Sequence, residues 1–217
     1  MRPKSAAGPR SVTTVPRMTS PSPRFTAGLL RPVLADFIDL VDGIGDEQVA
    51  RPTPCTAWDV SALVDHVTAM LDLYTQGLAH PDGELPPGVY LDRSQSPQER
   101  ADVLRGTAQL LDEAVLSGGA DRQLSSGGDG ADGDMVMWLL LWEAQIHGWD
   151  LAAALGEPWE RDEGALVESI QCRNNFLPAQ YRRDGPLYAP PVPVSALADP
   201  LETLLGYSGR DPWWTRP

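Results

Sequence analysis

The sequence predicts an all-α protein: an up-down four-helix bundle with an extra C-terminal helix and an extended proline-rich tail. Four long segments place apolar residues three or four positions apart, the spacing of a helix face that packs on a core. No two segments show the strict apolar and polar alternation of paired strands. The helices are therefore expected to bury their apolar faces against one another.

The chain begins with a stretch that is unlike the rest. Residues 1–25 hold five prolines and few bulky apolar side chains, so they are expected to form a disordered leader, with Met18 as an alternative start. The first helix is expected at about residues 26–43. Its apolar pattern continues across Pro32 and stops at Gly43.

The second helix is expected to begin after Thr56, the N-cap of a capping box whose acid is Asp59. It reaches about Leu78. Its apolar stripe includes Leu63, and His66 stands beside this stripe on the inward side of the helix.

A second capping box starts the third helix. Ser96 and Glu99 have the spacing of the box, and Pro97 occupies the favoured first helical position. The helix is expected to end near Leu116. The Gly, Asp and Ser-rich residues 118–133 that follow are expected to be a loop, either a mobile flap or plain surface.

The fourth helix is expected at about residues 134–155 and is apolar nearly all round, which predicts that it is the buried helix of the bundle. Gly156 ends it. A fifth helix is expected at about residues 162–178. Beyond it come a proline-rich extended segment, residues 186–194, and a short helix at about residues 200–206.

Length and charge limit the function classes. The chain has 217 residues, which suits one domain, residues 26–217, behind the leader. The first 25 residues carry five basic side chains and no acid, so the remainder carries a net charge of -18. Such a body repels phosphate backbones, and a nucleic acid is not expected as a partner.

Membrane insertion and secretion are not expected either. The apolar run of residues 135–142 is too short to span a bilayer, and the leader lacks the apolar core of a secretory signal. The two cysteines, Cys55 and Cys172, form no disulfide framework and no CxxC spacing. A reduced cytoplasmic protein, monomer or homodimer, is the expectation.

Three side chains in the buried segments stand out for their chemistry. The chain has three histidines, and two of them, His66 and His147, fall in strongly apolar helices where an unpartnered imidazole is costly to bury. Glu143 lies four residues before His147 and therefore on the same helix face. Two imidazoles and one carboxylate from facing helices of a bundle are the ligands of an open divalent metal site.

These residues also have an ordinary interpretation. A lone histidine on an apolar face is more often a hydrogen-bonded core residue, and Glu143 with His147 has the spacing of a simple helix side-chain pair. From the residues alone, metal ligation and core hydrogen bonding stay equally open. Asp150, three residues after His147, either orients that imidazole from behind or is a surface acid near the helix end.

The remaining candidates are weaker. Cys55 lies just before the second helix, where a thiol can be activated, but a buried structural cysteine is the favoured interpretation. Cys172 has no catalytic setting around it, and His80 is expected in a loop. The trio of His66, Glu143 and His147 is a ligand set that favours zinc and is also compatible with nickel, iron or manganese.

Three segments resemble one known family. PTPCTAWDV at residues 52–60, followed by LVDH at residues 63–66, is similar to the entry of the second helix in the DinB-like superfamily of the mycothiol-dependent maleylpyruvate isomerase N-terminal domain. EAQIHGWDL at residues 143–151 is similar to its second metal motif. LLGYSGRDPW at residues 204–213 resembles the C-terminus of its small metal-binding members, so that the resemblance covers residues 26–217.

The resemblance implies a four-helix bundle that holds a divalent metal, often zinc, through the counterparts of His66, Glu143 and His147. It also implies chemistry in which mycothiol adds to a substrate through a metal-activated sulfur. The isomerase carries a further C-terminal domain with an arginine that its reaction needs, and this chain is expected to be too short for that whole domain. The fold and the metal are therefore implied more directly than the isomerisation.

The leading hypothesis is a metal-dependent enzyme that activates a mycothiol-type thiol for S-transfer or isomerisation on a small electrophile. No catalytic residue beyond the three ligands is assigned. Two alternatives remain at this stage: a non-catalytic, metal-stabilised binding module, and a hydrolase in which the metal activates water.

Overall fold

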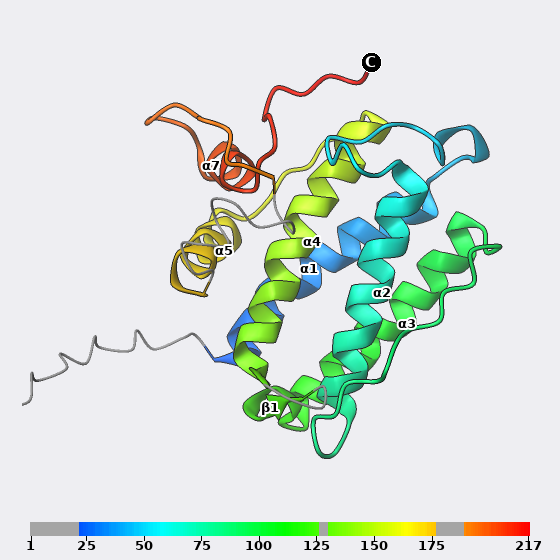
Figure 1. Cartoon of the computed structure of the whole chain (residues 1–217), viewed down its shortest axis with the longest axis vertical. Coiled ribbons are helices and arrows are strands. Elements are labelled where there is room, and N and C mark those ends of the chain that lie inside the picture. The colour runs from blue at the N-terminus through cyan, green and yellow to red at the C-terminus, as the bar shows by residue number, and fades with distance from the viewer. Residues whose placement is uncertain (1–21, 126–129, 177–188) are drawn as a thin grey trace, which may run out of the picture.

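The computed structural model describes residues 22–125, 130–176 and 189–217. Within these ranges, four long helices form an all-α bundle, as expected, and two further helices lie beside it (Figure 1). The helices are α1 (Pro23–Asp42), α2 (Val60–Ala79), α3 (Pro97–Leu116), α4 (Gly133–Leu155), α5 (Glu163–Phe176) and α7 (Pro200–Tyr207). Helices α1 and α2 each pack against both α3 and α4, so α1 and α2 occupy opposite corners of the bundle.

Helix α1 begins earlier than its apolar pattern predicts. The Ser22 side chain accepts a hydrogen bond from the Phe25 amide, and Pro23 stands at the first helical position. Residues 22–25 of the expected leader are therefore helix or helix cap, and the leader's residues 1–21 lie outside the described part of the chain. Pro32 remains inside the helix.

The N-cap of α2 is Asp59, so the prediction of Thr56 was wrong. The Asp59 carboxylate accepts from the Ala62 amide at 2.8 Å. The preceding residues fold into a turn because the Thr53 hydroxyl donates to the carbonyls of Cys55 at 3.1 Å and Trp58 at 2.8 Å. This turn places residues 53–58 against the first turns of α2. The capping box of Ser96 that opens α3, by contrast, forms as predicted.

The segment expected as a loop between α3 and α4 is partly structured. It contains a 3-10 turn, η2 (Gly119–Asp121), and a short antiparallel hairpin of two two-residue strands, β1 (Gln123–Leu124) and β2 (Ala131–Asp132). The earlier 3-10 turn, η1 (Asp46–Gln48), follows α1. The described part of the segment is thus held by backbone pairing, and residues 126–129 lie outside the described structure.

Helix α4 is the buried helix, as its composition predicts, and most of its side chains are enclosed. It ends at Gly156, which has a positive φ of 83°. Helix α5 ends at Phe176, and the last two residues of the expected helix lie outside the described residues. No helix in the described ranges combines the length and the apolar character needed to cross a membrane.

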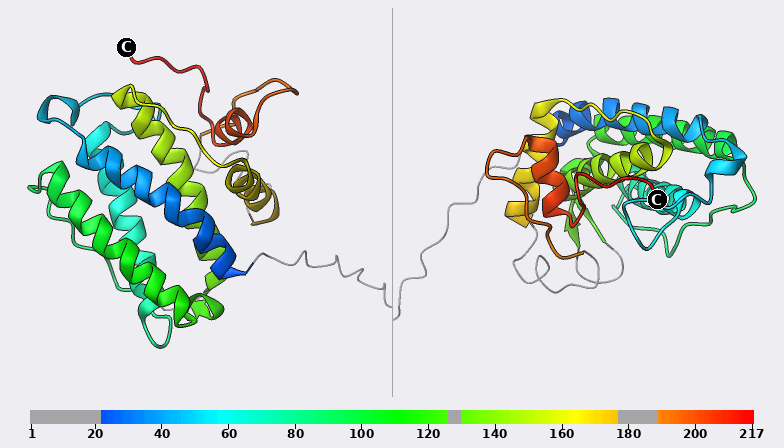
Figure 2. Two further views of the ribbon diagram at one scale, coloured as in Figure 1. Left: turned by 180° about the vertical axis from the view of Figure 1, so that it is seen from behind. Right: turned by 90° about the horizontal axis from the view of Figure 1, so that it is seen from above.

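The C-terminal elements dock on one face of α4 (Figure 2). A small apolar cluster joins Trp142 and Ile146 of α4 to Leu166 of α5 and Leu204 of α7. Gln145, which is fully buried, donates to the Ala165 carbonyl and to the Ser169 hydroxyl of α5.

The proline-rich tail also packs against these elements. Its described part, residues 189–194, forms neither helix nor strand, and the Val192 amide donates to the Gly206 carbonyl of α7 at 2.9 Å. Residues 186–188 lie outside the described structure. The C-terminal elements and this segment therefore lie over the part of α4 that carries Glu143 and His147.

Candidate metal centre

The structure brings the three predicted ligands together. His66 of α2 and His147 of α4 both turn their Nε2 atoms toward one carboxylate oxygen of Glu143, at 3.6 Å and 3.0 Å. The two imidazole rings are 5.0 Å apart, edge to face. The candidate ligand atoms of the three side chains all lie within 4.8 Å of one another.

The trio is enclosed on the α4 side and open on the α2 side. The side chains of Glu143 and His147 are 11% and 5% exposed, whereas that of His66 is 34% exposed. The contact of His66 with Glu143 is too long for an ordinary hydrogen bond, so its Nε2 has only a loose partner. His66 thus forms the accessible edge of the cluster.

Trp58 covers both imidazoles. Its ring stacks on His66 with centroids 4.3 Å apart and an interplanar angle of 29°, and it lies 5.4 Å from the ring of His147. The turn that ends at Asp59 supplies this position, because it brings Trp58 back over the first turns of α2.

Asp150 orients His147, one of the two roles considered for it. Its side chain is fully buried, and the Nδ1 atom of His147 lies 3.0 Å from its carboxylate. A proton on Nδ1 makes this a hydrogen bond and leaves Nε2 of the neutral ring with its lone pair toward Glu143. Asp150 is therefore not a surface acid.

Arg210, which sequence reasoning missed, completes this arrangement. Its guanidinium reaches Asp150 with Nη2 at 2.8 Å and Nε at 3.3 Å, and Nη1 donates to the Ser208 carbonyl at 2.8 Å. The Arg210 side chain is 9% exposed. The available signal was its place in the LLGYSGRDPW motif, which carried no indication of a contact with α4.

Electrostatics at the site favour positive charge. Burial alone would raise the pKa of Glu143, but the imidazoles of His147 and His66 lower it to about 2. Burial alone would lower the pKa of His147, but Asp150 and Glu143 raise it to about 9. Near pH 7 the carboxylate is thus ionised and the imidazole protonated, so the pocket between them already attracts one positive charge.

The residues present fit a divalent cation. Two neutral imidazole nitrogens and one carboxylate oxygen are donors that zinc and other borderline divalent metals accept, and they converge here from two facing helices. The oriented His147 and the depressed pKa of Glu143 both favour the ligand forms of these groups once a cation replaces the proton.

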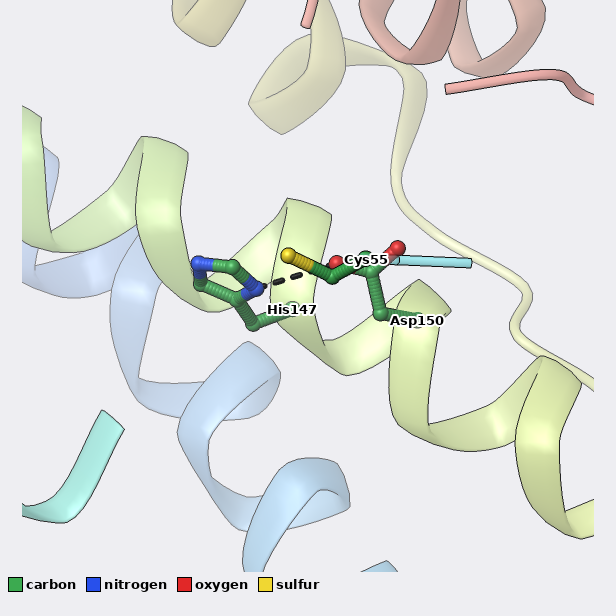
Figure 3. Close-up of side chains that lie close together, drawn as sticks. All are labelled: Cys55, His147 and Asp150. Carbon is green, nitrogen blue, oxygen red and sulfur yellow. Dashed lines mark hydrogen bonds and ion pairs between the residues drawn. The ribbon is translucent and has the colours of Figure 1, made fainter. Parts of the chain in front are cut away.

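A second cluster overlaps the first. Cys55, His147 and Asp150 also lie within 4.8 Å of one another, and Figure 3 shows the Cys55 sulfur beside the hydrogen bond between the other two. This cluster suits a cation less well, because Asp150 is already neutralised by the guanidinium of Arg210, whose charge repels a second cation.

Cys55 itself is only partly buried: it packs against the core and also lines the cavity, so the structural interpretation was incomplete. Burial raises the pKa of its thiol above the ordinary value, and the nearby Arg210 only partly opposes this shift. The thiol is therefore expected to stay protonated near neutral pH. It is an uncharged wall of the site rather than an activated nucleophile.

The trio lines a cavity of about 490 Å³. Its walls come from the turn before α2, from α4 and from the C-terminal segment, and they include Pro54, Cys55, Thr56, Ala57, Trp58, Trp142, Ile146, Ala189, Gly209 and Arg210. The third histidine, His80, caps the far end of α2, where its ring accepts from the Asp82 amide. Cys172 lies in α5, and its side chain is outside the described structure.

Comparison with known proteins agrees with this architecture. An uncharacterised protein of Mycobacterium tuberculosis, found in two strains, is 23% identical over 175 residues, which cover 80% of this chain and 91% of that protein. The crystal structure of the mycothiol-dependent maleylpyruvate isomerase has a similar fold, with a TM-score of 0.53 at 15% identity over 71% of this chain and 70% of its own. A mutant of that isomerase gives a TM-score of 0.52 at 12% identity.

The family itself follows from the sequence. The profile of the mycothiol maleylpyruvate isomerase N-terminal domain matches residues 30–152, more than half of the chain. The matched segment contains His66, Glu143 and His147, together with the helices that carry them. The chain therefore belongs to the family of the mycothiol maleylpyruvate isomerase N-terminal domain.

Proposed function

We propose that this protein is a metal-dependent enzyme that activates a low-molecular-weight thiol of the mycothiol type and adds it, through its sulfur, to a small electrophile. One observation carries the proposal: His66, Glu143 and His147 converge at the wall of a cavity of about 490 Å³. Catalytic zinc sites use three protein ligands and keep a further position for water or substrate, whereas structural sites are closed by four. Membership of the family supports a thiol as the fourth ligand.

The three side chains would hold the cation, with zinc preferred and nickel, iron or manganese as alternatives. A divalent cation held there supplies Lewis-acid chemistry, because it lowers the pKa of a thiol or water that reaches it and so provides a nucleophile near neutral pH. In the reaction, a bond forms between the sulfur and an electrophilic carbon while the π bond of that carbon opens, and the atom at the other end of the π system takes up the proton that the thiol has lost.

The chain's own residues shape this reaction. Asp150 keeps the proton of His147 on Nδ1, so that Nε2 remains available as a ligand. Trp58 lies against both imidazoles, and Trp142 and Ile146 give the cavity apolar walls that limit water.

Arg210 supplies a binding group for an anion. A guanidinium has five N–H groups, and the contacts with Asp150 and Ser208 use three of them. The other two have no partner among the described residues. Because Arg210 lines the cavity, a carboxylate on the thiol or on the electrophile would find a charge-assisted partner there.

Metal content is the first test of the proposal. The purified protein is expected to hold about one divalent cation per chain by elemental analysis. His66→Ala is expected to lose most of it, because it removes one of three ligands, whereas His80→Ala serves as a matched control since that histidine caps α2 away from the site. Full metal occupancy in His66→Ala would overturn the assignment of the site.

Thiol consumption is the second test. With mycothiol and a panel of small electrophiles, the wild type is expected to consume thiol in a metal-dependent manner, and His66→Ala is not. A cobalt-substituted protein separates the alternatives, because added thiol changes the ligand field only of an accessible site. An unchanged cobalt spectrum with no thiol loss would favour the non-catalytic binding module. Hydrolysis of an ester panel without thiol would favour the hydrolase.

A further inference from the structure

The C-terminal segment, residues 204–213, places the buried guanidinium of Arg210 at the wall of the candidate site. Arg210 follows a tight turn in which Gly209 has a φ of +78° and approaches the Ala189 carbonyl so closely that a Cβ at this position would lie 2.8 Å from it. The Arg210 amide donates to the Leu205 carbonyl of α7 at 2.9 Å. This backbone geometry directs a guanidinium from a surface segment into the interior beside α4.

The partner of that guanidinium is a fully buried carboxylate. A buried carboxylate in an apolar helix is tolerated only when a cation and further hydrogen bonds compensate it, and Arg210 and His147 supply these to Asp150. Its Oδ2 atom accepts from both Arg210 and His147, so the orientation of the carboxylate toward the imidazole is set by the arginine on its other side.

We infer that Arg210 is a positioning residue for the metal centre, acting through Asp150 on His147, and that docking of the C-terminal segment and cation binding stabilise each other. The inference rests on the proposed metal site. Arg210 holds the Asp150 carboxylate, the carboxylate holds the Nδ1 proton of His147, and Nε2 is thereby kept toward Glu143 and His66. Thermodynamic linkage makes the effect reciprocal, so a bound cation also strengthens the docking of the segment.

The segment has an anchor that does not depend on Arg210. Leu204 of α7 packs with Trp142 and Ile146 of α4, and Val192 pairs with α7 through its backbone. Loss of the guanidinium is therefore expected to leave α7 attached while it releases the Asp150 carboxylate. This separation allows the positioning role to be measured in a folded protein.

The test measures cation affinity in the absence of any thiol or electrophile, a readout that a purely substrate-binding role for Arg210 would not move. Zinc affinity is obtained by competition with a chromophoric chelator. Arg210→Met is expected to weaken zinc binding by about 10- to 100-fold, the usual effect of removing a partner behind a ligand. Arg210→Lys is expected to recover part of this loss, because it keeps the charge but not the planar double contact.

Two comparisons show whether the effect passes through Asp150. In an Asp150→Asn background, Arg210→Met is expected to cause no further loss of affinity, because the carboxylate through which it acts is gone. This double variant also avoids an uncompensated buried charge. Arg161→Met is the matched control: that arginine is also 9% exposed and ion-paired, to Asp36, but it lines a different cavity.

Hydrogen exchange measures the reciprocal effect. Zinc is expected to slow amide exchange in residues 204–213 of the wild type and to leave it unchanged in Arg210→Met. The inference would be overturned if Arg210→Met kept the zinc affinity of the wild type, or if Arg161→Met lost as much affinity as Arg210→Met. Loss of metal in His66→Ala would in that case still support the metal site itself. A wild type that binds no cation would overturn both the inference and the proposed function.

Discussion

Proton release on metal binding gives the sharpest prediction for the site. The raised pKa of His147, about 9, means that about 99% of the chains carry its proton at pH 7 before a cation arrives. A cation bound to Nε2 must displace the proton shared with Glu143. Zinc binding at pH 7 is therefore expected to release about one proton from this residue.

The magnitude follows from the same shift. Between pH 7 and pH 9 each unit rise in pH increases the fraction of chains with an unprotonated His147 about tenfold. Zinc affinity is therefore expected to rise about 100-fold over this range and then to level off. Titration calorimetry in buffers of different ionisation enthalpy counts the protons, with a chelator to buffer free zinc. Asp150→Asn is expected to move the plateau to lower pH, because it removes a group that raises the pKa of His147.

The thermal stability of the metal-depleted protein should fall with rising pH, opposite to the trend in zinc affinity. A raised pKa means that His147 contributes its full stabilisation below its ordinary pKa of 6.5 and loses it as pH rises through about 9. Thermal unfolding of the metal-depleted protein is expected to show this decline. Zinc affinity that is flat from pH 7 to pH 9, with no proton released, would refute the reasoning for both trends.

Two further predictions concern the surroundings of the site. Gly148→Ala is expected to destabilise the fold by about 1–3 kcal/mol in thermal unfolding, because the added Cβ would overlap the indole of Trp159. Gly106→Ala is the control and should stabilise the fold slightly, because a Cβ at this position meets nothing within 4 Å. Equal effects at both glycines would contradict the packing. In a Cys172→Ser background, the metal-depleted protein should be alkylated at Cys55 more slowly than in urea at pH 7, with the rate rising above pH 9 because burial raises the pKa of the thiol. Equal rates in the folded and unfolded protein would contradict that shift.

The bundle was predictable because its signals are local. Helical spacing located all four long helices, and the box of Ser96 fixed the start of α3. The errors occurred where two local signals compete. Thr56 and Asp59 are both good N-caps, and the choice depends on the Thr53 hydroxyl, which closes a turn over the residues between them. Apolar periodicity carries no information about such a turn.

The candidate site also has a part that local sequence signals predict and a part that they do not. Glu143 and His147 share a helix face by spacing alone, and Asp150 follows on the same face, so one helix accounts for most of the cluster. Arg210 lies 60 residues from Asp150, and its position depends on where α7 docks. No periodicity in the sequence fixes that docking, which comes from side-chain packing between segments far apart in the chain.

Charge balance links this arrangement to the proposed chemistry. The buried carboxylates of Glu143 and Asp150 face one fixed guanidinium, Arg210, so the chain alone leaves one negative charge uncompensated when the imidazoles act as neutral ligands. A divalent cation would turn this into one net positive charge in an enclosed, low-dielectric site. Such a site favours one more anionic partner, and a cavity of about 490 Å³ with apolar walls has room for a thiolate with its carrier molecule rather than hydroxide alone. Arg210 is thus needed for the balance: without it the cation would be fully neutralised, and the attraction for a thiolate would be lost.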